Sequence, residues 1–190
     1  MTLVPTRPYH HGNLPPAILA AAIDALTESG PTALSLRDVA RRAGVTHTAI
    51  AHHFGDKTGL LTSVATKGFL LQAEELANAH QRAGSFLDIA VAYVRFATTH
   101  RAYFDVMYRA DLYRNDDPAL LAARAMSSAS LYNNVGQIGT APSETTTAGI
   151  AAWSLVHGLA TLWLNGALPA ALGDDPEAIT RTVAIHLGKS

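Results

Sequence analysis

The sequence of 190 residues contains no cysteine, which excludes disulfide bridges, thiolate metal sites and thiol-based redox chemistry. It also lacks an excess of either charge, since 14 basic and 15 acidic side chains give a formal net charge of −1. The distribution is only slightly uneven, because residues 1–61 hold five Lys or Arg against four Asp or Glu, with five of the nine histidines. Charge alone therefore does not indicate nucleic-acid binding.

Long apolar runs are missing as well. The longest uninterrupted run, residues 17–23, is far shorter than the roughly 20 residues that cross a bilayer. Residues 1–16 are polar and broken by proline, unlike the basic start and apolar stretch of a signal peptide. We therefore expect a soluble, cytoplasmic protein that does not enter a membrane.

Common catalytic and metal-binding motifs are not found. There is no glycine-rich phosphate loop and no Gly-x-Ser-x-Gly turn. Ser154 and His157 lie on a predicted helix, where a packed interior or dimer-face histidine is the simpler interpretation. His52 and His53 are adjacent and point in different directions on a helix, and His47 is not on their face. We expect no enzyme activity, no metal and no cofactor.

What the sequence has is helix-forming residues, since alanine and leucine dominate a composition that is 48% apolar. Capping and breaking residues predict an all-α fold of about nine helices, with no strand and no internal repeat. The predicted helices cover approximately residues 14–30, 36–43, 47–53, 56–79, 85–99, 103–107, 117–135, 144–165 and 176–187. We expect an N-terminal arm and three-helix head over 1–55, and a helical body over 56–190.

Residues 36–50 have the spacing of a helix-turn-helix. Val39 and Val45 supply an apolar seam, and Gly44 is free to adopt the left-handed conformation of the turn. Ile50 returns to that seam from the second helix. An ordinary helical hairpin that ends in glycine has the same pattern, so the spacing alone leaves both interpretations open.

The surrounding residues resemble the TetR family of transcriptional regulators. The similar stretches within residues 9–61 are Tyr9-His10-His11-Gly12-Asn13-Leu14, Ser35-Leu36, Ala43-Gly44-Val45-Thr46, His53-Phe54-Gly55-Asp56-Lys57 and Leu60-Leu61. In the body, Trp153-Ser154-Leu155-Val156-His157-Gly158 resembles the Trp-His-Gly signature of one C-terminal subfamily. The resemblance implies a DNA-binding head on a ligand-sensing, dimerising body.

The resemblance implies that the second helix of the motif lies in the major groove of DNA. Phosphate contacts carry over to His53 and Lys57, and the helix starts at Ser35 and Thr46 are expected to face phosphates as well. The remaining predicted DNA-binding residues are Arg7 on the arm, Arg37 at the flank, and His47, Thr48 and His52 on the recognition helix.

One residue departs from the family pattern. Ala51 stands where these proteins usually have tyrosine, so a common DNA contact is missing. We expect either weaker binding or a changed operator preference. A methyl contact between Ala51 and thymine is one alternative, and a silent helix position is the simplest interpretation.

Aromatic side chains at helical spacing fill the body, which the family uses as a ligand pocket, although such stripes are more often plain core. The candidate effector-pocket residues are Tyr93, His100, Tyr103, Tyr108 and Trp153. Small and apolar residues along the last two long helices predict a dimer interface, with burial in the same subunit as the alternative. The candidate interface residues are Leu155, Gly158, Leu159, Leu162 and Val183.

The sequence therefore predicts a homodimeric repressor that binds a palindromic double-stranded DNA operator and is released by a small, largely apolar effector. Activation in place of repression is compatible with the same residues. One alternative is a helical protein-interaction module with weak or no DNA binding, which predicts no salt-dependent affinity for duplex DNA. Another is a helical small-molecule-binding or catalytic domain, against which the missing catalytic set argues.

Overall fold

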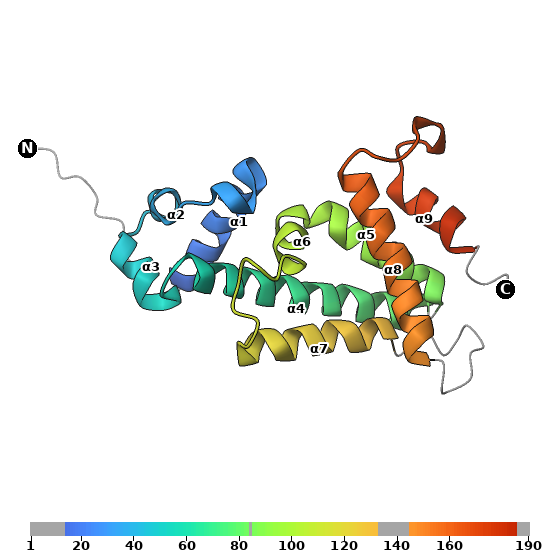
Figure 1. The fold of residues 1–190 in the computed structure, drawn as a ribbon, viewed down its shortest axis with the longest axis horizontal. Coiled ribbons are helices and arrows are strands. Elements are labelled where there is room, and N and C mark those ends of the chain that lie inside the picture. The colour runs from blue at the N-terminus through green and yellow to red at the C-terminus, as the bar shows by residue number, and fades with distance from the viewer. Residues whose placement is uncertain (1–13, 84, 133–144, 186–190) are drawn as a thin grey trace, which may run out of the picture.

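The computed structural model describes residues 14–83, 85–132 and 145–185, and in these ranges every regular element is a helix (Figure 1). The α-helices are α1 (Leu14–Ala33), α2 (Leu36–Ala43), α3 (His47–Phe54), α4 (Lys57–Ala83), α5 (Phe86–Thr99), α6 (Arg101–Met107), α7 (Pro118–Tyr132), α8 (Thr145–Leu164) and α9 (Pro176–Ala184), with a short 3-10 helix, η3 (Ala170–Leu172), before the last. The predicted all-α fold of about nine helices is confirmed. Arg7 and the helix ends expected at 135 and 187 lie outside the described residues.

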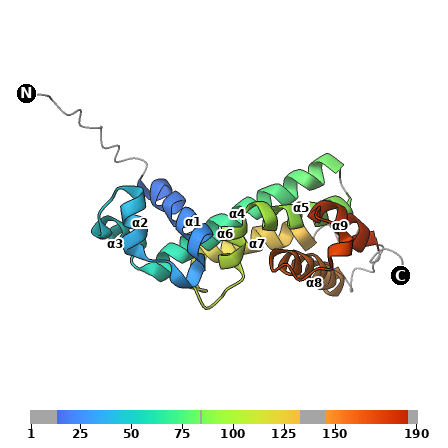
Figure 2. The same cartoon turned by 90° about the horizontal axis from the view of Figure 1, so that it is seen from above.

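Helix α4 is the axis of the molecule. Figures 1 and 2 show α1, α2 and α3 gathered as a head at its N-terminal end, with α5, α6 and α7 packed along the rest. Helices α8 and α9 lie together at the end far from the head. Because α4 contacts α1 and α3 as well as the body helices, and α6 also contacts α1, the head is held to the body through two helices.

Capping residues set several of these helix starts, as the sequence indicated. The Thr46 hydroxyl accepts the Ala49 N–H at 3.2 Å at the start of α3. The Asp56 carboxylate accepts the Gly59 N–H at 2.7 Å at the start of α4. Ser35 stands at the N-cap of α2 in an extended conformation, but its hydroxyl makes no capping hydrogen bond. The expected Ser35 cap is therefore correct in position and wrong in its contact.

Helix α1 continues beyond its predicted end. Gly30 adopts φ 72° and ψ 172°, which breaks the regular helix, and Pro31 then begins a last turn that reaches Ala33. The prediction placed the stop at this glycine and proline. The structure has a kink there because proline is well accommodated in the first turn of a new helical segment.

Helix α8 leaves much of its apolar surface uncovered within the subunit. By length and composition, Thr147–Leu164 is long and apolar enough to cross a membrane, yet only 28% of it is buried within the subunit. This segment contains no long uninterrupted apolar run, because single polar residues interrupt it without making it hydrophilic. One such helix is weak evidence for a membrane segment, since a helix that packs against another protein has the same composition.

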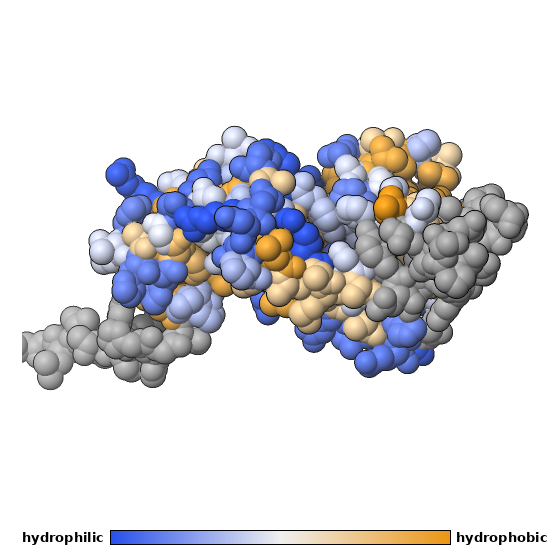
Figure 3. All heavy atoms as spheres, turned by 60° about the horizontal axis from the view of Figure 1, so that its bottom comes forward, coloured by the Kyte–Doolittle hydropathy of each residue, from blue (hydrophilic) through white to orange (hydrophobic). Residues whose placement is uncertain are grey.

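Apolar side chains are also exposed on α7. Leu121 and Met126 are 48% and 55% exposed. Figure 3, in which the α7 side of the molecule comes forward, shows an apolar band across the middle of this face. Exposed apolar residues thus occur on two separate helices, α7 and α8.

Candidate functional site

The head has the geometry of a helix-turn-helix. Gly44 adopts φ 66° and ψ 31°, the left-handed conformation that favours glycine, and it joins α2 to α3. The Val45 N–H donates to the Ala40 carbonyl at 3.0 Å, which closes the turn. Val39 and Ile50 are fully buried in the seam between the two helices. The helix-turn-helix interpretation is therefore confirmed in its geometry.

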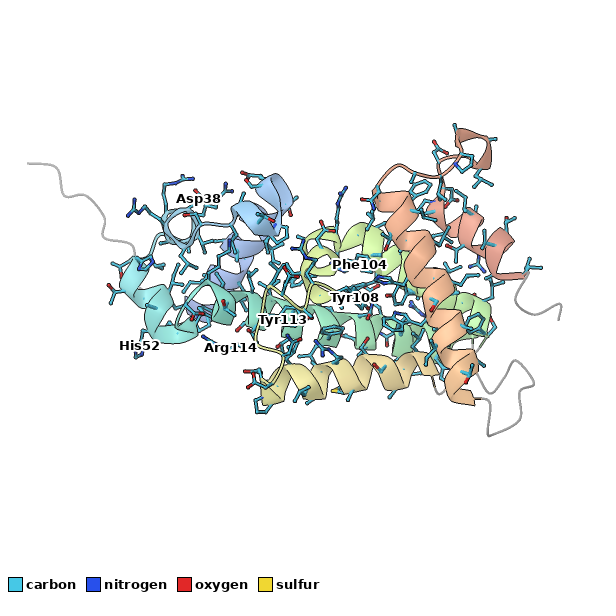
Figure 4. The ribbon with its side chains drawn as sticks, in the orientation of Figure 1. Asp38, His52, Phe104, Tyr108, Tyr113 and Arg114 are labelled. Atoms are coloured by element: carbon cyan, nitrogen blue, oxygen red, sulfur yellow. The ribbon has the colours of Figure 1, made fainter. Side chains whose placement is uncertain are left out.

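Helix α3 presents polar side chains to solvent. His47, Thr48, His52 and His53 are all exposed, and Figure 4 shows His52 pointing away from the head. Ala51 is partly buried, and its carbonyl accepts the Gly55 N–H at 2.9 Å at the C-terminal end of the helix. The four polar residues predicted to face DNA thus share the solvent-exposed part of one short helix.

The arginine residues of α2 differ in whether their guanidinium groups are free to contact DNA. Arg42 donates to both carboxylate oxygens of Glu28 at 2.7 and 2.6 Å, and also to Asp38 at 2.6 Å. The hydrogen bonds from Arg42 lower the pKa of Glu28 and of Asp38. Arg41 also pairs with Asp38. Arg42 therefore ties α2 to α1, whereas the exposed Arg37 forms no hydrogen bond or ion pair within the described residues.

Lys57 joins two helices of the head. Its Nζ donates to the carbonyl of Thr32, near the end of α1, at 3.1 Å. The side chain is partly buried at the first position of α4. Lys57 thus has a structural contact in addition to the phosphate contact predicted for it.

The body has a partly open cavity of about 320 Å³ between α4, α5, α6, α7 and α8. Three of the predicted pocket residues, Tyr93, Tyr108 and Trp153, line it. The structure does not bring the other two into its wall. His100 instead lies 3.0 Å from the Glu75 carboxylate, and Tyr103 packs against His100 at a ring distance of 6.2 Å.

A chain of hydrogen bonds runs along the cavity wall. The Trp153 Nε1–H donates to the Tyr93 hydroxyl at 3.2 Å, and that hydroxyl donates to Tyr108 at 3.0 Å. Tyr108 in turn donates to Gln72 Oε1 at 3.0 Å, which also accepts from Ser127 at 2.6 Å. Because Trp153 can only donate, the chain ends on the oxygen of Gln72.

His157 lies beside this chain. Its Nδ1 is 2.9 Å from the Tyr93 hydroxyl, and its ring packs on Tyr108 at a centroid distance of 4.5 Å. Burial lowers the pKa of His157 and raises the pKa values of Tyr93 and Tyr108. All three side chains are therefore neutral at pH 7. His157 is partly buried against aromatic side chains, which is compatible with either of the two roles expected from the sequence, a packed interior or a dimer-face histidine.

Most of the residues that line the cavity were not predicted from the sequence, and two of them are central to its chemistry. Gln72 and Arg124 line the cavity from α4 and α7. A signal for Gln72 was present, because it is polar on a helical face shared with the apolar Phe69 and Leu76. Arg124 gave no such signal, since α7 carries polar residues on several sides.

The loop between α6 and α7 connects the cavity to the head. Tyr113 lines the cavity and donates to the Met107 carbonyl at 2.6 Å. The next residue, Arg114, donates from Nη2 to the Asp56 carboxylate at 2.9 Å and from its backbone to Thr62 Oγ1 at 3.1 Å. Figure 4 shows Arg114 on the head side of Tyr113. A single loop thus touches both the cavity and the junction of α3 and α4.

The predicted dimer residues fall into two groups. Leu162 is 46% exposed, and Leu155, Gly158 and Val183 are partly exposed. A Cβ added to Gly158 would meet nothing within 4 Å in the same subunit. Leu159 is only 7% exposed and packs in the core. We therefore assign Leu159 to the core and keep the other four as interface candidates.

A helix-turn-helix head on a helical body with a cavity is the architecture of a class of DNA-binding regulators. The family described as "Bacterial regulatory proteins, tetR family" matches residues 18–64, and "Tetracyclin repressor-like, C-terminal domain" matches residues 86–186. The chain belongs to the TetR family and is a DNA-binding transcriptional regulator. Its narrower assignment to the Trp-His-Gly subfamily stays a prediction.

Individual relatives agree with this assignment. The chain is 30% identical over 178 residues, 85% of each chain, to the HTH-type transcriptional regulator BetI of Ectopseudomonas mendocina. It is 48% identical over 48 residues, 25% of this chain and 26% of the relative, to the HTH-type transcriptional repressor Rv3405c of Mycobacterium tuberculosis. A solved structure of a protein with unknown function from Rhodococcus sp. RHA1 superposes with a TM-score of 0.81 at 30% identity, covering 97% of this chain and 98% of the other.

Proposed function

We propose that the protein is a homodimeric repressor that binds a palindromic operator through α3 and is released when a small molecule enters the cavity of the body. The observation that carries this proposal is the pairing of an exposed helix of the helix-turn-helix with a cavity in the body, linked by the loop between α6 and α7. A dimer supplies the two-fold symmetry that a palindromic site requires.

The proposed DNA contacts are made by side chains that are exposed on the head. Thr48 and His52 lie on the outer part of α3 and have polar groups for base edges. His53 at the end of α3, Arg37 on α2 and the helix starts at Ser35 and Thr46 are placed for phosphates. Phosphate contacts fix the register of the head, and base contacts carry the sequence preference.

The dimer would form through α8 and α9. These helices lie at the end of the molecule far from the head, and α8 leaves much of its apolar surface uncovered. Gly158, with open space around it, allows a partner helix to approach closely. A four-helix interface made from two copies of α8 and α9 would cover Leu155, Leu162 and Val183.

Ligand release needs only a modest coupling between cavity and head. Coupling free energies of about 1–3 kcal/mol are typical of such regulation, and the ligand must bind the DNA-incompetent state better. Tyr113 in the cavity wall and Arg114 at Asp56 are consecutive residues, so a ligand that moves this loop also moves the start of α4. A changed position of α4 alters the spacing of the two heads.

The test is binding to the DNA upstream of the protein's own gene, measured by fluorescence anisotropy of labelled duplex across a salt series. We expect tight binding that weakens steeply with salt and is competed poorly by random duplex. Thr48→Ala should lower operator affinity by roughly 1–3 kcal/mol. Thr27→Ala, at an exposed threonine of α1, is the matched control and should not. Equal affinity for operator and random duplex would contradict the proposal.

A further inference from the structure

The cavity wall holds more hydrogen-bond donors than acceptors. Gln72 is 1% exposed, and its Oε1 is occupied by Tyr108 and Ser127. Its Nε2 is buried and has no hydrogen-bond acceptor within the described residues. Leaving a buried amide nitrogen unpaired is unfavourable, so such groups are normally satisfied. The two N–H bonds of Gln72 are therefore available to an acceptor group inside the cavity.

Arg124 brings the only charged side chain to the described cavity wall. Its guanidinium donates to the Tyr113 hydroxyl at 3.0 Å, and its Cζ lies 5.5 Å and 5.8 Å from the ring centres of Phe69 and Tyr113. Contacts with aromatic rings stabilise the cation but use none of its N–H donors. No acidic side chain lines the cavity in the described residues, so the charge of Arg124 has no counter-ion there.

Arg124 and Gln72 approach the same part of the cavity. Arg124, Ser127, Ser128 and Leu131 all line it, and their spacing places them on one face of α7. Ser127, one turn beyond Arg124, donates directly to Gln72. Through Ser127, one turn of α7 links the side chains of Gln72 and Arg124, so both donors can serve a single acceptor group in the cavity.

We propose that the cavity binds a small aromatic carboxylate, whose carboxylate pairs with Arg124 and accepts from Gln72. An arginine fork matches a carboxylate in shape and charge, and a neutral acceptor gains less from it. The apolar part of the ligand packs among Phe69, Tyr108 and Trp153, which also line the cavity. A volume of about 320 Å³ is near the lower limit of small-molecule sites, which favours a small acid over a long-chain one.

This inference rests on the proposed role of the cavity as the effector site, and it makes the effector an acid where the sequence predicted a largely apolar molecule. The test compares 3-phenylpropanoate with the neutral 3-phenylpropanamide, which has nearly the same shape. Isothermal titration calorimetry at pH 7 measures the affinity of each for the full chain. We expect the carboxylate to bind roughly 10- to 100-fold more tightly than the amide.

Three variants test whether Arg124 is responsible for the preference for the carboxylate. Arg124→Met should remove the preference for the carboxylate and leave the amide affinity nearly unchanged. Arg124→Lys keeps the charge but loses the planar fork, so an intermediate preference is expected even if Arg124→Met folds poorly. Arg101→Met, at an exposed arginine of α6 paired with Asp105, is the matched control and should retain the full preference.

Operator binding, measured in the same solutions, separates this inference from the proposed function. Preferential carboxylate binding without operator release would support the acid site and contradict ligand-released repression. Equal binding of the two compounds, with operator release by both, would contradict the acid site and support ligand-released repression. Binding of neither compound would overturn the inference that the site takes small aromatic carboxylates.

Discussion

Arg114 Nη2 lies 2.9 Å from Asp56 Oδ2, so the loop that lines the ligand cavity is bonded to the residue that caps α4. The Gly59 N–H lowers the pKa of Asp56, and Arg114 contributes in the same direction. Asp56 therefore stays ionised at neutral pH. The pair joins the body to the turn directly after the recognition helix.

Arg114→Met should uncouple ligand from operator without unfolding the protein. Both partners are largely exposed, so the ion pair contributes little to stability, and the Tm should fall by at most about 2–4 °C. The loss of operator affinity caused by saturating 3-phenylpropanoate should become smaller than in the parent protein. Arg109→Met is the control, because Arg109 pairs with Asp111 in the same loop. An unchanged ligand response in Arg114→Met would contradict coupling between cavity and head through the ion pair of Arg114 with Asp56.

Arg37 and Arg42 should differ in their effect on DNA binding. Arg37→Met should reduce the slope of log affinity against log salt by about one, because it removes a predicted phosphate contact. Arg42→Met should leave that slope nearly unchanged, since its guanidinium is occupied by Glu28 and Asp38. It should instead lower the Tm. Salt titration of operator affinity checks both, and a larger slope change in the Arg42 variant would contradict the assignment.

His157 should make stability depend on pH. Burial lowers its pKa below the ordinary 6.5, so between the two values the unfolded chain binds a proton that the folded chain does not. This contribution is fully present above about pH 6.5 and is lost as the pH falls through the folded pKa. The Tm of His157→Gln should therefore change less between pH 7.5 and 5 than that of the parent protein. His80→Gln, at an exposed histidine of α4, should keep the parental dependence.

Leu162→Glu should dissociate the proposed dimer. A charge at the centre of an apolar helix interface is costly to bury, whereas Leu162 is 46% exposed in the single subunit and tolerates the change there. Leu121→Glu on α7 is the matched control, since Leu121 is 48% exposed but lies outside the predicted interface. Sedimentation velocity should find a monomer for the first variant and the parental state for the second. A monomeric parent protein would overturn the interface.

The helices were predictable because their ends depend on local chemistry. Asp56 and Thr46 accept backbone N–H groups three residues ahead, and that pattern is visible in the sequence. Gly44 was also recognisable, because only a turn between two helices explains a glycine between Ala43 and Val45. The sequence correctly indicated that the helix is interrupted at Gly30, but it predicted that the helix ends there. The additional turn after Gly30 depends on packing against other parts of the chain, which a local pattern does not reveal.

The cavity was only partly predictable, because its wall is made by distant segments. Tyr93, Tyr108 and Trp153 were found by their aromatic character, but His100 has the same character and points to Glu75 instead. Which face of α6 and of the end of α5 turns inward depends on how these helices pack against α4. Gln72 and Ser127 are separated by 55 positions, and no local pattern indicates that they share a hydrogen bond.

The position of Trp153 gives the protein an optical reporter of its own. Trp153 lines the cavity, and its indole N–H donates to Tyr93, so a ligand that enters changes both the polarity and the hydrogen bonding around the ring. Only one other tryptophan is present, Trp163, which follows on α8 about 15 Å further along the helix axis. Replacing Trp163 with phenylalanine leaves Trp153, at the cavity, as the only tryptophan. Its emission wavelength then follows occupancy directly, in a protein that carries no dye and is free of DNA.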